Sequence, residues 1–133
     1  MARCAGRRTA FPAALCEAFG EQSAASPQGA ARLRRTQERG GAVRLVRTRD
    51  GGCAGGGSCS PPAVGTSELT GVGTRPAHRG RGVAAAVVAS LTRAMFAAGA
   101  GSVWLEYSGD GSRRVYERLG YRPTGERLYL SMR

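Results

Sequence analysis

The sequence predicts an α/β fold in which helices flank a mixed sheet, and two segments indicate this class. Ala42–Thr48 alternates apolar and polar residues, and Asp50-Gly51 after it is a strong signal for a two-residue turn into an antiparallel strand over Cys53–Ser60. Residues 67–107 have the pattern of strand, helix and strand, which needs a right-handed crossover between parallel strands. A hairpin joined to such a crossover requires a sheet with both strand directions.

The crossover unit has the clearest periodicity. A strand is predicted over Ser67–Thr74, where Gly71 and Gly73 suggest a bulge. The helix predicted over Gly82–Ala98 has one apolar stripe at helical spacing. Its members are Val83, Val87, Leu91, Met95 and Ala98. Ser102–Tyr107 is predicted to be the second strand of the unit.

The other predicted elements complete one domain over residues 11–133. Helices are predicted over Phe11–Phe19 and Gly29–Arg39, because of helical apolar spacing in the first and helix-forming residues in the second. A short helix from about Ser112 to Leu119 precedes a last extended strand over Tyr121–Arg133. Residues 1–10 are basic and aperiodic, and we predict that they are disordered.

Composition argues against several classes of protein. No apolar run reaches the roughly 20 residues of a membrane span, so we expect a cytoplasmic protein that does not cross a membrane. The net charge is +11, but the sequence has no lysine, its arginines are scattered and aromatic residues are few. A solvated basic surface is therefore favoured over nucleic-acid binding. The four cysteines form no C-x-x-C pair and the chain has one histidine, so we expect reduced thiols and no metal site.

The segment between the crossover strand and its helix suits a polyanionic ligand. Arg75-Pro76-Ala77-His78 forms a short loop, and Arg79-Gly80-Arg81-Gly82 follows immediately before the helix. A helix N-terminus presents unpaired N–H groups, and glycines allow a ligand to approach the backbone. Together with the arginines, this predicts a pyrophosphate site. A nucleoside-triphosphate loop would need a lysine, and the dinucleotide fingerprint is not matched.

Two motifs resemble those of the GNAT superfamily of N-acetyltransferases. Arg79-x-x-Gly82-x-Ala84, between a strand and a long helix, resembles the family's acyl-CoA motif R/Q-x-x-G-x-G/A. Arg114-Val115-Tyr116-Glu117-Arg118-Leu119-Gly120-Tyr121 resembles the end of its last helix, and the two motifs have the family's order and spacing. The resemblance implies a mostly antiparallel sheet with a central parallel strand pair. It also implies acetyl transfer from acetyl-CoA to a small-molecule or peptide amine.

The resemblance also implies roles for particular residues. The backbone of Val72, Gly73 and Thr74 would bind the pantetheine arm. The backbone N–H groups of Arg79, Gly80, Arg81, Gly82, Val83 and Ala84 would bind the pyrophosphate. Tyr116 would protonate the leaving thiolate, for which a phenol with a pKa near 10 is suited. Glu68 is the first candidate for the base and Glu106 the second, with water as the alternative to both.

Two other functions remain open at this point. The domain could bind acyl-CoA without turnover, and less favoured is a basic nucleic-acid-binding protein. The acceptor amine is not predicted, because substrate pockets in this architecture come from the first helices and the C-terminal strands. An exposed C-terminal strand would allow a homodimer.

Overall fold

The computed structural model describes residues 27–132. The predicted helix over Phe11–Phe19 and the basic end over residues 1–10 lie outside this range. The elements along the chain are α2 (Pro27–Glu38), β1 (Ala42–Arg47), β2 (Cys53–Cys59), β3 (Thr66–Thr74), the 3-10 helix η1 (Pro76–His78), α3 (Val83–Ala97), β4 (Ser102–Trp104) and α4 (Asp110–Arg118).

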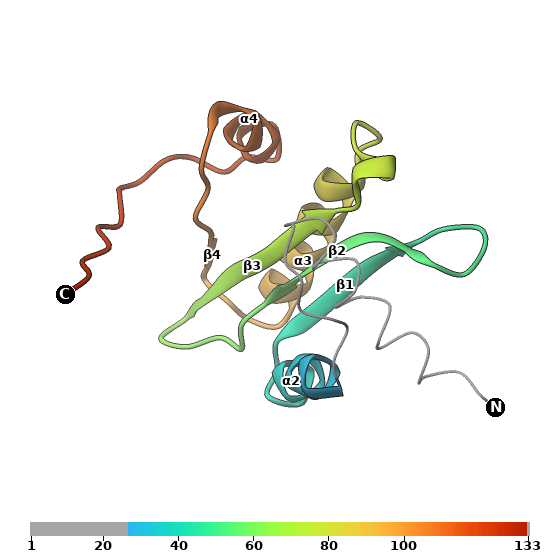
Figure 1. Ribbon diagram of the computed structural model, residues 1–133. Coiled ribbons are helices and arrows are strands. Elements are labelled where there is room, and N and C mark those ends of the chain that lie inside the picture. The colour runs from blue at the N-terminus through green and yellow to red at the C-terminus, as the bar shows by residue number, and fades with distance from the viewer. Residues whose placement is uncertain (1–26, 133) are drawn as a thin grey trace.

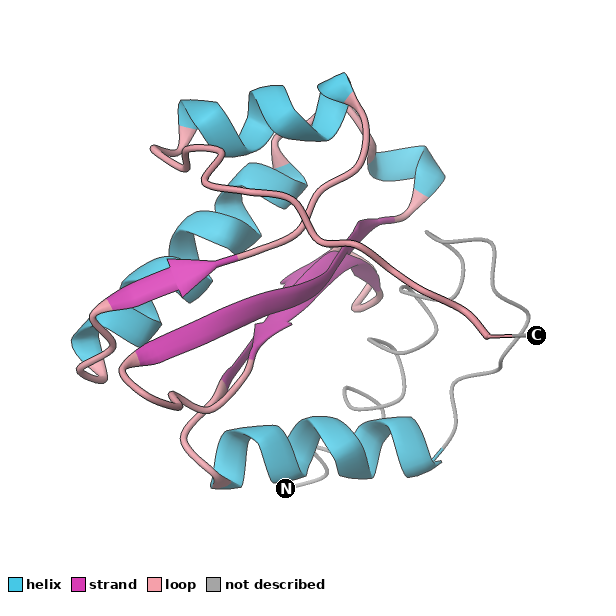
Figure 2. Cartoon of the chain, turned by 90° about the vertical axis from the view of Figure 1, so that its left-hand side faces the viewer, coloured by secondary structure: helices cyan, strands magenta, loops and turns pink. Residues whose placement is uncertain are grey.

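The described strands form one sheet in the order β1-β2-β3-β4. β1 pairs with β2 and β2 with β3 in antiparallel fashion, whereas β3 and β4 are parallel. Figure 2 shows α2 on one side of the sheet and α3 and α4 on the other. The predicted mixed α/β fold is confirmed.

The β1–β2 hairpin turns at the predicted place, but through three residues, Arg49 to Gly51, and not through the predicted two. The N–H of Gly51 donates to the carbonyl of Thr48 and that of Thr48 to the carbonyl of Gly52, both at 3.1 Å, and Gly51 has φ of 87°. The Asp50 carboxylate accepts hydrogen bonds from the Thr48 hydroxyl and the Gly52 N–H. These bonds stabilise the ionised form and lower the pKa of Asp50.

The glycines of β2 let α3 pack closely on the sheet. A Cβ at Gly57 would lie 3.1 to 3.2 Å from side-chain atoms of Val72, Val87 and Leu91. At Gly55 it would lie 2.3 Å from the carbonyl oxygen of Gly73, closer than such atoms can approach. The low strand propensity of this segment is therefore outweighed by the contact that its missing side chains permit.

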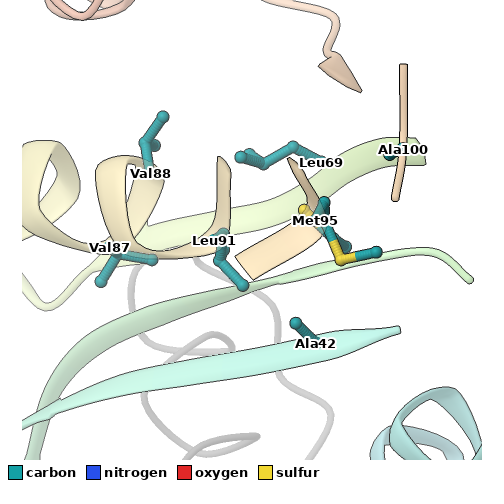
Figure 3. Packing of buried hydrophobic residues seen from close by; sticks show 8 residues of the cluster. Ala42, Leu69, Val87, Val88, Leu91, Met95 and Ala100 are labelled. Carbon is teal, nitrogen blue, oxygen red and sulfur yellow. The ribbon is translucent and has the colours of Figure 1, made fainter. Parts of the chain in front are cut away.

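The main core lies between α3 and the sheet. Leu91, Val88 and Met95 of α3 are buried, and Leu69 of β3 and Ala42 of β1 belong to the same cluster. Figure 3 shows Leu91 directed from the helix toward the strands. On the opposite face, a smaller cluster joins Leu33 of α2 with Val43, Leu45 and the buried Cys53.

All three described α-helices end in the same way, with a glycine at positive φ. These residues are Gly40, Gly99 and Gly120. In α4, the N–H of Gly120 donates to the carbonyl of Glu117 and that of Tyr121 to the carbonyl of Tyr116. This pair of bonds is the Schellman motif, in which the glycine takes the left-handed position and the next residue packs back on the last turn.

Two predicted elements differ from the structure. The strand predicted over Ser102–Tyr107 pairs only over Ser102–Trp104, and residues 121–132 form no strand. Both differences have one cause: strand formation depends on a partner backbone, and β4 has one only where it runs beside β3. α2 begins at Pro27, ahead of the predicted Gly29, because proline is tolerated in the first turn of a helix.

No helix in the described range is long and apolar enough to cross a membrane.

Candidate functional site

A bulge in β3 marks the start of the site. Gly56 pairs with Gly73 and Ser58 with Thr70, so β3 contains one residue more than β2 over this stretch, and Gly71 there has φ of 62°. The predicted bulge is confirmed. It places Val72, Gly73 and Thr74 at the end of a strand that has changed direction.

β3 and β4 pair over a short length and then separate. Their register runs from Thr66 opposite Ser102 to Glu68 opposite Trp104, the last pair. Figure 1 shows the two strands spreading apart, with β4 leading toward α4 and β3 toward the loop before α3. The carboxyl ends of two parallel strands thus form the two sides of an open V.

In the loop after β3, the backbone is open to the approach of a ligand. Gly80 and Gly82 have φ of 75° and 76°, and a Cβ on either would have no atom within 4 Å. Gly82 begins α3, and no side chain caps the helix. Within residues 27–132, no backbone carbonyl accepts a hydrogen bond from the N–H groups of residues 80–85. These N–H groups and the helix dipole favour an anionic ligand here.

A cleft of about 570 Å³ lies between this loop and α4, and we call it the loop cleft. Most residues predicted to hold a coenzyme line it, namely Val72, Gly73, Thr74, Arg79, Gly80, Gly82, Val83 and Ala84. Arg81 is exposed and is not among the lining residues. The Arg79 guanidinium donates from Nε to the carbonyl of Thr74 at 3.3 Å, which ties the loop to the end of β3.

The loop cleft is also lined by residues to which the sequence analysis assigned no role in binding. They are His78, Ala85, Ser112, Val115, Arg118 and Leu119. Ser112, Val115 and Arg118 belong to α4, whose position across from the loop is a tertiary feature without a local signal. Arg118 adds a second guanidinium to a cleft that has exposed N–H groups, so the residues present suit a phosphate-bearing ligand.

A second cleft of about 600 Å³ lies on the other side of Tyr116, between β4, α4 and residues 121–125, and we call it the β4 cleft. Val103, Trp104 and Leu105 contribute to its floor. Tyr116 and Leu119 line both clefts. Tyr116 therefore stands at the boundary between the loop cleft and the β4 cleft.

The position of Tyr116 is fixed by the end of α4. Its carbonyl accepts the N–H of Tyr121 at 3.0 Å, and its ring meets the Tyr121 ring edge to face at 6.2 Å between centroids. The Tyr121 hydroxyl in turn lies 2.6 Å from the Thr92 hydroxyl of α3. Among the described residues, no hydrogen bond involves the Tyr116 hydroxyl, and burial raises the pKa of Tyr116 above its usual value of 10.0.

The two glutamates proposed as bases lie in different surroundings. Glu68 is half-buried at the last paired position of β3, on the opposite face from the buried Ser67 and Leu69, and lines neither cleft. Within the described range, no hydrogen bond or ion pair engages its carboxylate. Glu106 forms an ion pair with Arg127 and accepts a hydrogen bond from Tyr129.

Known proteins share both the sequence pattern and the fold. The model of the acetyltransferase (GNAT) family matches residues 11–121. A putative acetyltransferase from Agrobacterium tumefaciens is 18% identical, with 98% of each chain covered and a TM-score of 0.77. Glucosamine-6-phosphate N-acetyltransferase from Arabidopsis thaliana is 15% identical, with 96% of this chain and 92% of that chain covered and a TM-score of 0.76.

An aminoglycoside N-acetyltransferase solved in complex with CoA is 21% identical, with 77% of this chain and 90% of that chain covered and a TM-score of 0.60. No curated protein matches the chain significantly. The structural likenesses establish the fold, and the family model covers most of the sequence, including both motifs around the loop cleft. The chain belongs to the GNAT family of acetyltransferases, enzymes that use acetyl-CoA.

Proposed function

We propose that the chain transfers the acetyl group of acetyl-CoA to an amine by direct attack, with the coenzyme in the loop cleft and Tyr116 as general acid. The observation that carries this proposal is the position of Tyr116, which lines both the loop cleft and the β4 cleft. A thioester that reaches this boundary from one cleft would meet an amine that enters from the other.

The coenzyme would bind through groups that the fold leaves available. The N–H groups at the start of α3 and the guanidinium groups of Arg79 and Arg118 would hold the pyrophosphate. The backbone of Val72, Gly73 and Thr74, beyond the point where β3 and β4 cease to pair, would bind the pantetheine arm as a missing strand would. Arg81 would contribute through its main chain only, because its residue lies outside the lining of the cleft.

The reaction would take one displacement at the acetyl carbonyl. The amine nitrogen forms a bond to the carbonyl carbon, the carbon–sulfur bond breaks and the thiolate receives the proton of the Tyr116 hydroxyl. The amine loses one proton to a base, and Tyr116 is reprotonated from solvent. Burial raises the pKa of Tyr116, so its phenol is protonated at neutral pH and has the proton that this role requires.

The proton from the amine would pass to Glu68 through a water molecule. Glu68 lies where the V between β3 and β4 begins, and its carboxylate has no ion-pair partner within residues 27–132. Glu106 is a weaker candidate, since its carboxylate already contacts Arg127 and Tyr129. Replacement Glu68→Gln should then lower kcat at low pH more than at high pH, where the amine is already neutral.

Coenzyme binding is tested by calorimetric titration of acetyl-CoA. Gly82→Glu should abolish saturable binding, because it adds a carboxylate where the anionic pyrophosphate would lie. Gly51→Glu is a matched control, since Gly51 also has positive φ and open space around its Cβ position but lies in the β1–β2 turn. Equal binding by both variants would place the coenzyme elsewhere and refute the proposed cleft.

Turnover is tested by thiol release with a panel of amines. The sequence contains no lysine, so the protein offers no ε-amine of its own as a competing acceptor. Thiol release that depends on an added amine supports the transfer reaction. Saturable acetyl-CoA binding without release for any amine would instead favour a domain that binds acyl-CoA without catalysis.

A further inference from the structure

We infer that the outer face of β4 binds a second cationic group of the acceptor, so that the preferred acceptors are diamines or related polycations. This inference rests on the proposed acetyl transfer and names the substrate class. The residues that carry it are Trp104, Glu106 and Tyr129, which we call the cation cradle, and Arg127 is the residue that occupies it.

Strand alternation separates the cradle from the core. Val103 and Leu105 pack against the main core. Trp104 and Glu106 alternate with them along the chain, so they belong to the face of the sheet away from the main core. Trp104 is paired in register with Glu68, which brings a second carboxylate to the same part of this face. Two carboxylates and an indole ring thus gather beside the opening between β3 and β4.

Within the chain, the cradle holds the cationic side chain of Arg127. The Arg127 guanidinium lies 5.1 Å from the centre of the Trp104 ring and 5.9 Å from that of Tyr129, and it forms an ion pair with Glu106. Tyr129 also donates its hydroxyl hydrogen bond to Glu106, which holds the carboxylate in place. Aromatic faces combined with a carboxylate are the chemistry that recognises ammonium and guanidinium groups.

An external cation can replace Arg127 in the cradle. Its side chain is 48% exposed and that of Glu106 is 37% exposed, so solvent and solutes reach the pair. Within the described range, residues 122–132 make no backbone–backbone hydrogen bond. An external cation that replaces Arg127 therefore disrupts no helix or strand of the described chain.

The cradle is connected to the proposed reaction centre. Trp104 lines the β4 cleft, and Tyr116 lines the same cleft. A molecule with one cationic group on Trp104 would therefore extend its other amine along this cleft toward the acetyl group. The net charge of +11 repels cations from the protein as a whole, so local carboxylates such as Glu106 would be needed to select them.

The first test uses the fluorescence of Trp104, the only tryptophan in the sequence. The full chain is titrated with α,ω-diaminoalkanes from propane to octane and with the alkylamine of each length. We expect a saturable change of emission with diamines at concentrations about threefold lower than with alkylamines, because the second ammonium group of a diamine adds an ion pair with the neighbouring Glu68. This measurement needs neither coenzyme nor turnover.

Variants distinguish binding at the cradle from a general effect of the net charge. Glu106→Gln should weaken the diamine response about tenfold, whereas Glu126→Gln, the same charge change on an exposed neighbour, should leave it unchanged. Arg127→Gln should strengthen the response because it removes the internal competitor. Arg49→Gln in the β1–β2 turn is its matched control. Circular dichroism verifies that each variant is folded.

Steady-state kinetics then link the cradle to acetyl transfer. The KM for diamines should fall with Arg127→Gln and rise with Glu106→Gln and Trp104→Phe, and one chain length should be preferred. Equal KM and emission responses for diamines and alkylamines, with turnover intact, would refute the cradle and leave the proposed function standing. A selective diamine response without acetyl-CoA binding would support the cradle as a cation site and refute the proposed transfer.

Discussion

The backbone and ring of Tyr116 serve the fold, whereas its hydroxyl has no hydrogen-bond partner among the described residues. Its carbonyl accepts the N–H of Tyr121 in the Schellman motif of α4, and its ring packs on Tyr121, which Thr92 fixes to α3. The motif Tyr116-x-x-x-Gly120-Tyr121 is thus explained first by helix termination. In this position Tyr116 lines both the loop cleft and the β4 cleft.

At the residue scale, we predict that Tyr116→Phe lowers kcat about 100-fold and leaves the Kd for acetyl-CoA unchanged. The phenol donates only while it is protonated, and burial places its pKa above 10.0. The wild-type rate should therefore decline only at pH values above this, and the variant should lose that decline. The measurement is the kcat of both proteins across alkaline pH. A kcat unchanged by Tyr116→Phe would show that water, and not Tyr116, protonates the leaving thiolate.

At the scale of elements, β2 contributes to the fold through the space that its missing side chains leave for neighbouring residues. Its glycines were a weak signal in the sequence, yet they admit the side chains of α3 and the carbonyl of Gly73. Because Gly55 also approaches Val83 at the start of α3, β2 helps to set the separation of the bulge and the helix N-terminus that line the loop cleft. The packing of this strand and the geometry of the site are therefore linked.

We predict that Gly55→Ala lowers the free energy of unfolding by about 2 kcal/mol and also weakens acetyl-CoA binding. A methyl group there would lie 2.3 Å from the Gly73 carbonyl oxygen, so the bulge would have to move. Gly111→Ala is the control: this residue of α4 has no atom within 4 Å of its Cβ position, and the substitution should raise stability by up to about 1 kcal/mol. Urea denaturation and calorimetry measure the two effects, and identical results for both variants would contradict the prediction.

For the whole molecule, the sequence predicted those parts that depend on local pattern. The hairpin at Asp50-Gly51, the bulge at Gly71 and the helix over most of Gly82–Ala98 are confirmed, because turn chemistry and helical periodicity are encoded within a few residues. The length of β4 and the wall that α4 gives to the loop cleft were not predicted. Both depend on which distant segments meet, and no local pattern encodes that.

The whole molecule should lose stability in alkaline solution. Burial raises the pKa of Cys53 and Cys59 above 9.0 and that of Tyr116 and Tyr121 above 10.0. In the unfolded chain these groups ionise at their usual pKa values, so the contribution is complete below pH 9.0 and declines as pH rises beyond it.

Denaturation in urea at a series of pH values should therefore give a constant free energy of unfolding from neutrality to about pH 8.5 and a decline at higher pH. The variant with both Cys53→Ala and Cys59→Ala should show a smaller decline in the first unit above pH 9.0. A free energy of unfolding that rises with pH would contradict the assignment.

The short pairing of β3 with β4 has a consequence for cooperativity. Three register pairs, from Thr66–Ser102 to Glu68–Trp104, are the only backbone ladder that joins the C-terminal portion to the rest of the described chain. In the apoprotein, amide hydrogens of α4 should therefore exchange with solvent faster than those of α3, which packs against all four strands of the sheet. A coenzyme that contacts both sides of the V would couple the unfolding of α4 to that of the rest of the sheet. Slower hydrogen exchange in α4 on coenzyme binding would demonstrate this coupling.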